Sequence, residues 1–299
     1  MFKLQEKEEE IQFFNNLPSS TLDDVSELIK EFNSMKLEDL SDKYIHHTID
    51  KLTECYFMLP YTIKSSMVFF RVRLSKDWVL YDHINDLKYP PKNNIKLGRA
   101  NDSTFPVFYA ASSPETAFAE CRLKANDLFY LAQYSIHKET TAPLLYVIGD
   151  LDNIRRKSNT VLNDHRFLKA YENILENIRP DIKLAIQLVD AFFVDWISKK
   201  GEDNYKITSK IFKEFFTAQN LSCIFYPSVE HSGGYNYAFT AEAYDSYLIP
   251  EQVSVCYVEK TYGYGAYEIK QSPYYGINNT TGKIELDLNI KDIYLSLKK

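Results

Sequence analysis

The chain has 299 residues, of which 45% are hydrophobic, so it can bury a sizeable core and is not expected to be disordered. Its 41 acidic and 35 basic residues give a formal net charge of −6, which argues against direct nucleic-acid binding, since that needs a concentrated basic surface. The charged first ten residues lack the apolar run of a secretory signal, and no run of about 18 uncharged apolar residues could span a membrane. We therefore expect a cytoplasmic protein that binds no membrane.

The cysteines are far apart in the sequence and form no CxxC pair. This spacing favours reduced thiols in a core over disulfides or a zinc site, and we expect no bound metal. The residues concerned are Cys55, Cys121, Cys223 and Cys256.

Residues 1–62 are predicted to form a helical N-terminal extension. Apolar residues recur at helical spacing over residues 22–32, behind capping candidates at 19–21, and again over residues 40–56. Pro60 is expected to end the second helix.

The rest of the chain alternates between strand and helix patterns. Strands are predicted at 66–74, 106–111, 128–137, 143–151, 221–226, 235–240 and 253–260, with a helix over 114–124 and a helical insert over about 163–219. Mixed strands with clustered helices favour an α+β fold over a regular βαβ array. The phosphate loop GxxxxGK[ST], GxGxxG, HExxH and GxSxG are all absent.

Three arginines are candidates for binding an anion. Arg71 and Arg73 alternate with apolar residues in a strand, so they share a face and could grip a diphosphate bidentately. The alternative is an exposed edge with two solvated guanidiniums, which the period alone favours. Arg99 lies in a loop that by itself is an ordinary turn.

Glu120 is the candidate carboxylate. It stands in the predicted helix between Ala119 and Cys121, where a buried acid usually has a partner or a function. The alternative is an outward side chain that pairs with Lys124 four residues later, and the spacing alone does not decide between the two.

The loop over residues 226–236 follows a predicted buried strand. Ser228, Asn236 and the loop amides could bind an anion or a sugar, or the loop could be a structural connection only. Ser228 and His231 are too close in sequence to argue for a serine-hydrolase triad, and no third member is identifiable.

Taken together, these segments resemble the RES domain, named for its Arg, Glu and Ser. The resemblance rests on the order of the motifs, above all on residues 98–120, and covers about two thirds of the chain. The matching tracts are Phe69-Phe70-Arg71-Val72-Arg73, Pro90-Pro91, Gly98-Arg99-Ala100-Asn101, residues 108–117 with Glu120, and Ile224-Phe225-Tyr226-Pro227-Ser228 with Gly234 and Asn236.

The resemblance implies a fold like that of ADP-ribosyltransferases, with a mixed β core and an NAD-binding cleft. The catalytic domain would span 63–262, with the insert at about 163–219 and a C-terminal extension, 263–299, packed on the core. The implied catalytic residues are Glu120, Arg71, Ser228 and Tyr109; the implied NAD-binding residues are Arg71, Arg73, Arg99, Tyr109, Ser228 and Asn236. Whether Arg71 or Arg73 is essential stays open.

The resemblance also implies a function. We expect an enzyme that breaks the nicotinamide–ribose bond of NAD with water or inorganic phosphate as the acceptor, without a cofactor, and that arrests growth as a toxin. Its implied partner is an antitoxin protein, and a homodimer is one option for its assembly. The alternatives are a protein ADP-ribosyltransferase and a non-catalytic nucleotide-sensing or interaction module.

Overall fold

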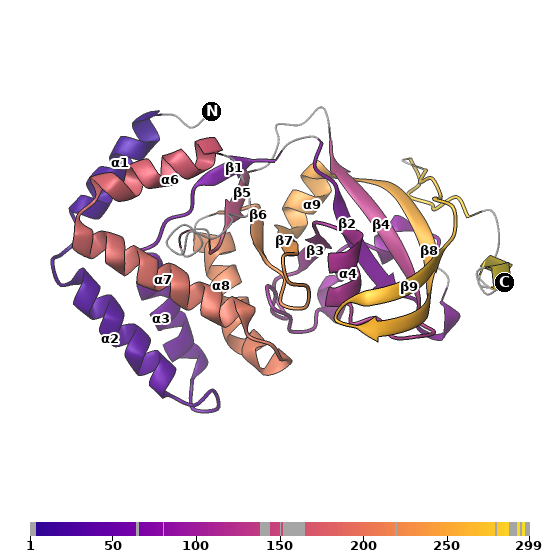
Figure 1. The fold of residues 1–299 in the computed structure, drawn as a ribbon, viewed down its shortest axis with the longest axis horizontal. Coiled ribbons are helices and arrows are strands. Elements are labelled where there is room, and N and C mark those ends of the chain that lie inside the picture. The colour runs from indigo at the N-terminus through magenta and orange to yellow at the C-terminus, as the bar shows by residue number, and fades with distance from the viewer. Residues whose placement is uncertain are drawn as a thin grey trace. The chain divides into compact units, whose positions relative to one another are not determined.

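The computed structural model describes residues 4–63, 66–79, 81–137, 144–149, 151, 165–218, 220–278, 280–286, 292–293 and 295–296. Within it, the chain divides into two compact units (Figure 1). The helical unit comprises Met1–Tyr61, Lys96–Asp102 and Tyr146–Leu221, and the sheet unit comprises Thr62–Ile95, Ser103–Leu145 and Ser222–Lys299. The predicted N-terminal extension and helical insert thus belong to one unit; residues 163, 164 and 219 of the insert lie outside the described residues.

The helical unit is organised around α7, which is apolar on most of its surface. Its helices are α1 (Leu4–Asn15), α2 (Thr21–Ser34), α3 (Asp42–Thr53), α6 (His165–Asn177), α7 (Pro180–Ser198) and α8 (Tyr205–Ala218). Figure 1 shows α2 running alongside α7. Phe32 of α2 is fully buried there, with its ring edge-on to Phe192 and Trp196 of α7. The amphipathic pattern predicted for residues 22–32 is therefore satisfied by a helix–helix contact.

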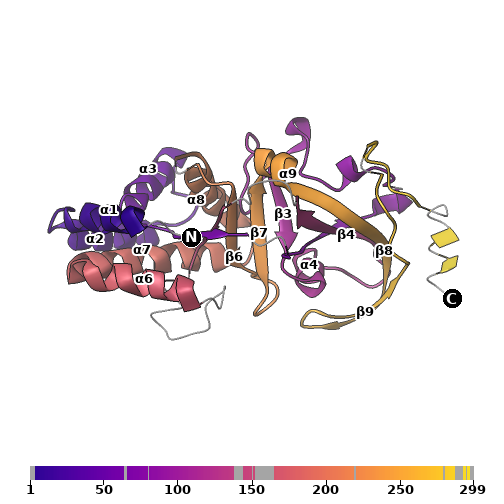
Figure 2. The same ribbon diagram turned by 90° about the horizontal axis from the view of Figure 1, so that it is seen from above.

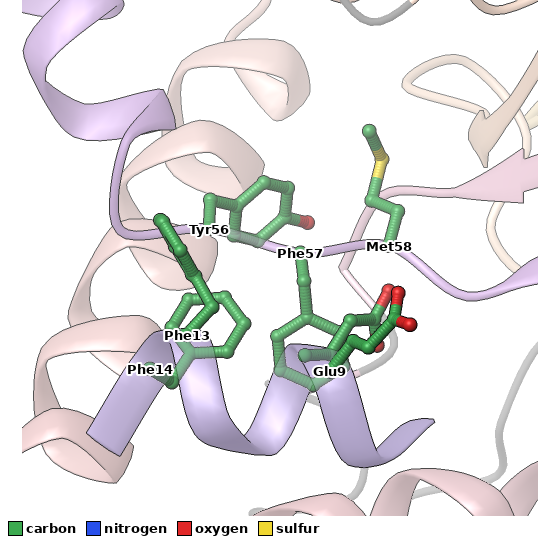
Figure 3. Close-up of a pocket in the computed structure, with 7 residues that line it drawn as sticks. Glu9, Phe13, Phe14, Tyr56, Phe57 and Met58 are labelled. Atoms are coloured by element: carbon green, nitrogen blue, oxygen red, sulfur yellow. The ribbon is translucent and has the colours of Figure 1, made fainter. Parts of the chain in front are cut away.

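A pocket lies between α1 and the segment that follows α3. Figure 3 shows aromatic rings from both segments around it, together with the Glu9 side chain. The lining residues are Glu9, Glu10, Phe13, Phe14, Tyr56, Phe57 and Met58. None of the site residues predicted from the sequence is among them.

Within its described residues, the sheet unit holds strands in the order β6-β7-β3-β2-β4-β8-β9, and each neighbouring pair is antiparallel. The strands are β2 (Phe69–Leu74), β3 (Val107–Ala111), β4 (Leu128–Ile136), β6 (Cys223–Pro227), β7 (Tyr235–Thr240), β8 (Leu248–Gly263) and β9 (Ala266–Gln271). The unit also contains α4 (Pro114–Glu120) and α9 (Ala241–Tyr247), while the short strands β1 (Pro60–Thr62) and β5 (Leu144–Val147) span points where the chain passes between units. Helices and a sheet of this kind confirm the α+β prediction; the likeness to ADP-ribosyltransferases stays a prediction.

The sheet is joined loosely at its centre. Strand β2 pairs with β4 from Phe69 to Leu74, and β3 pairs with β7 from Val107 to Ala111. Between β2 and β3, in contrast, the described register holds one position, Phe70 opposite Ala111. Because Ala111 ends β3, the two halves of the sheet separate on one side of that position, from Arg71 onward, which leaves backbone groups of β3 to find other partners.

Side chains alternate between the two faces of a strand, and this alternation decides which residues can meet. Figure 2 shows α4 and α9 on opposite sides of β3. Val72 packs in a core cluster with Ala117 of α4, so the side chains on either side of it, Arg71 and Arg73, project from the opposite face. That opposite face carries α9, because Phe108 of β3 contacts Tyr244 of α9, with ring centroids 4.5 Å apart.

Several element boundaries differ from those predicted. Helix α4 ends at Glu120 and not near residue 124, because Arg122 adopts a left-handed backbone with φ of 48°. Helix α9 was not predicted; Thr240 begins it, with its hydroxyl accepting a hydrogen bond from Ala243 N. Strand β9 lies within the C-terminal extension, where no strand was predicted. Of the C-terminal extension predicted over 263–299, residues 279, 287–291, 294 and 297–299 lie outside the described residues.

Candidate active site

The candidate site is built on α4, a short helix with a well-defined start. Ser113 precedes the helix and its hydroxyl accepts a hydrogen bond from Thr116 N at 3.2 Å, while Pro114 occupies the first turn. Glu120 is the last residue of the helix. The helix start and end therefore fix where the carboxylate lies.

The Glu120 carboxylate accepts two short hydrogen bonds at one oxygen. Ser228 Oγ donates to Oε1 at 2.6 Å, and Asn236 Nδ2 donates to the same atom at 2.6 Å. Asn236 is buried, and it lies on β7 directly opposite Ala111, on the face that carries α4. The structure thus brings together three of the predicted residues from distant parts of the sequence. Glu120 makes these contacts in place of the alternative pairing with Lys124.

The loop that carries Ser228 closes on itself. Ser228 N donates to Gly234 O at 2.8 Å, and Gly234 N donates to His231 O at 2.9 Å. His231 N donates to Ser228 Oγ at 3.0 Å, and the His231 ring is hydrogen-bonded to Thr116 of α4. Neither Thr116 nor His231 was predicted from the sequence as a site residue, since both gain their role from contacts between distant segments.

Arg71 lies on the other face of the sheet and bridges its divergent halves. Nη1 donates to the Tyr109 carbonyl of β3 at 2.7 Å, and Nη2 donates to the Lys88 carbonyl at 3.2 Å. The guanidinium also lies over the Phe108 ring, 4.9 Å from its centroid. Burial lowers the pKa of Arg71 from its usual range, but a guanidinium stays charged in proteins.

Tyr109 lies between Arg71 on one face of the sheet and the Glu120 carboxylate on the other. Its carbonyl holds Arg71, while its partly buried side chain shares the α4 face with Ala111 and hence with Asn236. Strand β3 therefore presents a backbone atom to the arginine and a phenol ring to the face of the carboxylate.

The other two predicted arginines are placed differently. Arg73 is exposed, with its guanidinium 5.7 Å from the centroid of the Tyr81 ring. Arg99 is buried in the helical unit, where it donates to the Ile197 and Lys199 carbonyls at the end of α7, at 2.5 and 3.1 Å. Those contacts give Arg99 a structural role within its own unit.

Cys121 directly follows Glu120 in the sequence. Burial raises the pKa of Cys121 to about 11, so the reactive thiolate is scarce under physiological conditions. All four cysteines are free. Over the described part of the chain, no group of His, Cys, Asp or Glu could hold a metal ion, and no helix could cross a membrane.

Residues 68–257, well over half of the chain, match the RES domain family. The chain belongs to the RES domain family. No curated protein and no solved structure matches it. The RES match includes every predicted site residue, from Arg71 to Asn236, and also spans α6, α7 and α8. RES domains are associated with toxins and with enzymes that act on NAD, and at this level the chain is a module of that kind.

Proposed function

We propose that this RES domain cleaves the nicotinamide–ribose bond of NAD and acts as a growth-arresting toxin. The observation that carries the proposal is the Glu120 carboxylate, fixed at Oε1 by Ser228 and Asn236. In the described residues Oε2 has no hydrogen-bond partner, so this oxygen is available to a ligand. A carboxylate oriented in advance, with one oxygen open, is suited to stabilise positive charge on a ribose ring.

The chemistry requires little beyond such a carboxylate. The bond between ribose C1′ and the nicotinamide nitrogen breaks, and the electron pair leaves with nicotinamide. The charge left on the ribose resembles an oxocarbenium ion, which a nearby carboxylate stabilises. The oxygen of water or of inorganic phosphate then bonds to C1′ and loses its proton to solvent or to Oε2.

Of the remaining predicted residues, Arg71 and Tyr109 are assigned to the rest of NAD. Arg71 uses two of its donors on backbone carbonyls, and a guanidinium has further N–H groups that suit the diphosphate. The Tyr109 ring, on the face of the carboxylate, suits the nicotinamide ring. An antitoxin partner and assembly as a homodimer remain predictions from the family resemblance.

Product analysis tests the proposal. Purified protein is incubated with NAD, with and without inorganic phosphate, and the products are identified by mass spectrometry. We expect free nicotinamide, with ADP-ribose from water or its phosphorylated form from phosphate. Glu120→Gln keeps the shape and removes the charge, so turnover should fall at least about a hundredfold.

Glu115→Gln is the matched control, because Glu115 is exposed on the same helix and makes the same charge change. It should retain nearly full turnover. Near-normal cleavage by a folded Glu120→Gln protein would contradict the role of the carboxylate. A mass increase on a protein acceptor, without free ADP-ribose, would support ADP-ribosyl transfer instead.

A further inference from the structure

The hydroxyl of Ser228 is oriented by a backbone amide. Ser228 Oγ accepts a hydrogen bond from His231 N at 3.0 Å and lies 2.6 Å from Glu120 Oε1. A carboxylate oxygen accepts only, so the serine hydrogen points toward Glu120. The placement of the His231 backbone therefore decides where the serine hydroxyl lies.

Side-chain hydrogen bonds link His231 to α4, the helix that carries Glu120. Thr116 Oγ1 and His231 Nδ1 are 2.8 Å apart, and Ser113 Oγ lies 3.1 Å from the same threonine oxygen. Thr116 is fully buried, one turn before Glu120 on α4. Helix α4 therefore holds both the Glu120 carboxylate and, through Thr116, the His231 residue whose backbone amide orients Ser228.

Gly234 of the loop packs closely against the hydrogen bond between Thr116 and His231. A Cβ atom on Gly234 would lie 2.4 Å from Thr116 Oγ1 and 2.7 Å from His231 Nδ1. Real Cβ atoms do not approach other atoms so closely, so a side chain at position 234 would displace the threonine or the histidine. Gly234 in turn bonds both His231 O and Ser228 N through its backbone.

A second tie between loop and helix is more exposed. Arg122 donates to Glu230 Oε1 at 2.9 and 3.2 Å, and the Arg122 side chain is more than half exposed. Exposed ion pairs of this kind contribute little to stability. The buried contact between Thr116 and His231 is the one that leads directly to Ser228.

We propose that Thr116 and His231 are positioning residues, which hold the Ser228 hydroxyl against Glu120 through the His231 amide. The inference rests on the proposed NAD cleavage and adds two residues that are not among the site residues predicted from the sequence. Neither residue needs to contact NAD. Their effect should fall on the chemical step, because a misplaced serine leaves the carboxylate with one of its two donors.

Thr116→Val tests this with little change in shape. It removes the hydroxyl that contacts His231, so the kcat for NAD cleavage should fall about tenfold while KM stays within about twofold. Thr116→Ser keeps the hydroxyl and should restore kcat to within about twofold of the wild type. Thr208→Val is the control: Thr208 is equally buried, on α8, and its hydroxyl has no hydrogen-bond partner in the described structure.

The outcomes separate the two proposals. If the wild type cleaves NAD and Thr116→Val keeps full kcat, the positioning role is wrong while the NAD proposal stands. If Thr116→Val and Thr116→Ser lose kcat equally, the hydroxyl is not the active group and the role is again wrong. If the wild type releases no nicotinamide, the proposed function fails and this inference fails with it. Thermal melting of each variant, compared with Thr208→Val, shows whether a loss of kcat merely follows a loss of folded protein.

Discussion

Arg71 and Arg73 stand two residues apart on one face of β2, yet their surroundings differ. Arg71 is partly buried, donates to two backbone carbonyls and lies over Phe108. Arg73 is exposed and contacts the Tyr81 ring. The sequence period places both on one face, but it could not reveal that β2 and β3 diverge beside Arg71.

This contrast predicts unequal effects of substitution. If Arg71 binds the diphosphate as proposed, Arg71→Ala should weaken NAD binding by about 2–5 kcal/mol, since it removes a partly buried cation from the diphosphate and also frees the Tyr109 carbonyl. Arg73→Ala should change binding by less than about 1 kcal/mol, as expected of an exposed charge. Calorimetric titration of NAD into each variant, made in the Glu120→Gln background to prevent turnover, measures both values. Equal and mild effects would show that neither arginine grips the diphosphate.

The residue pattern around Glu120 predicted a functional carboxylate but could not identify its partners. Its small and apolar neighbours on α4 indicated a carboxylate with a function, and the spacing equally allowed a pair with Lys124. Two facts outside the local pattern decide between them: the helix ends at Glu120, and β7 brings Asn236 within 2.6 Å of it. The periodicity of one segment cannot predict its contacts with residues far away in the sequence, such as Asn236.

At the scale of elements, α4 and the loop over residues 228–234 contact each other and together hold Ser228 against Glu120. The sequence predicted a helix that begins at residue 114 and a loop that follows a buried strand, and the structure contains both. The tight approach of Gly234 to Thr116 could not be predicted, because a glycine in a loop is usually explained by turn geometry. Here the neighbouring Gly233 has that geometry, with φ of 81°, while Gly234 supplies close approach.

Substitutions at the two glycines should therefore differ in their effects on stability and on turnover. Gly233→Ala places a side chain in open space but in a left-handed backbone, and should cost about 1 kcal/mol of stability with turnover nearly unchanged. Gly234→Ala forces Thr116 and His231 apart, and should cost about 1–3 kcal/mol and lower kcat about tenfold or more. Denaturant unfolding and NAD turnover measured on both variants make the comparison. A Gly234→Ala protein with normal kcat would show that the loop tolerates displacement.

At the scale of the whole molecule, the family match and the compact units divide the chain differently. The tract over residues 96–102 carries part of the RES resemblance, and it was predicted to belong to the catalytic domain. The structure groups it with the helical unit, where Arg99 binds the end of α7 and Asp102 accepts from Lys213 of α8 at 2.7 Å. The helical insert is thus tied to a family motif by hydrogen bonds within its own unit.

The proposed activity predicts a phenotype for the whole protein. An enzyme that removes NAD should arrest a bacterial host that expresses it, because NAD is needed throughout metabolism. Expression of the wild type should stop growth as the NAD pool falls, whereas Glu120→Gln, expressed to the same level, should be harmless. Thr116→Val should give a delayed arrest, in proportion to its about tenfold lower kcat. Growth curves with cellular NAD measured in parallel test the prediction. Arrest without loss of NAD, or equal toxicity of the Glu120→Gln protein, would show that the toxicity has another cause.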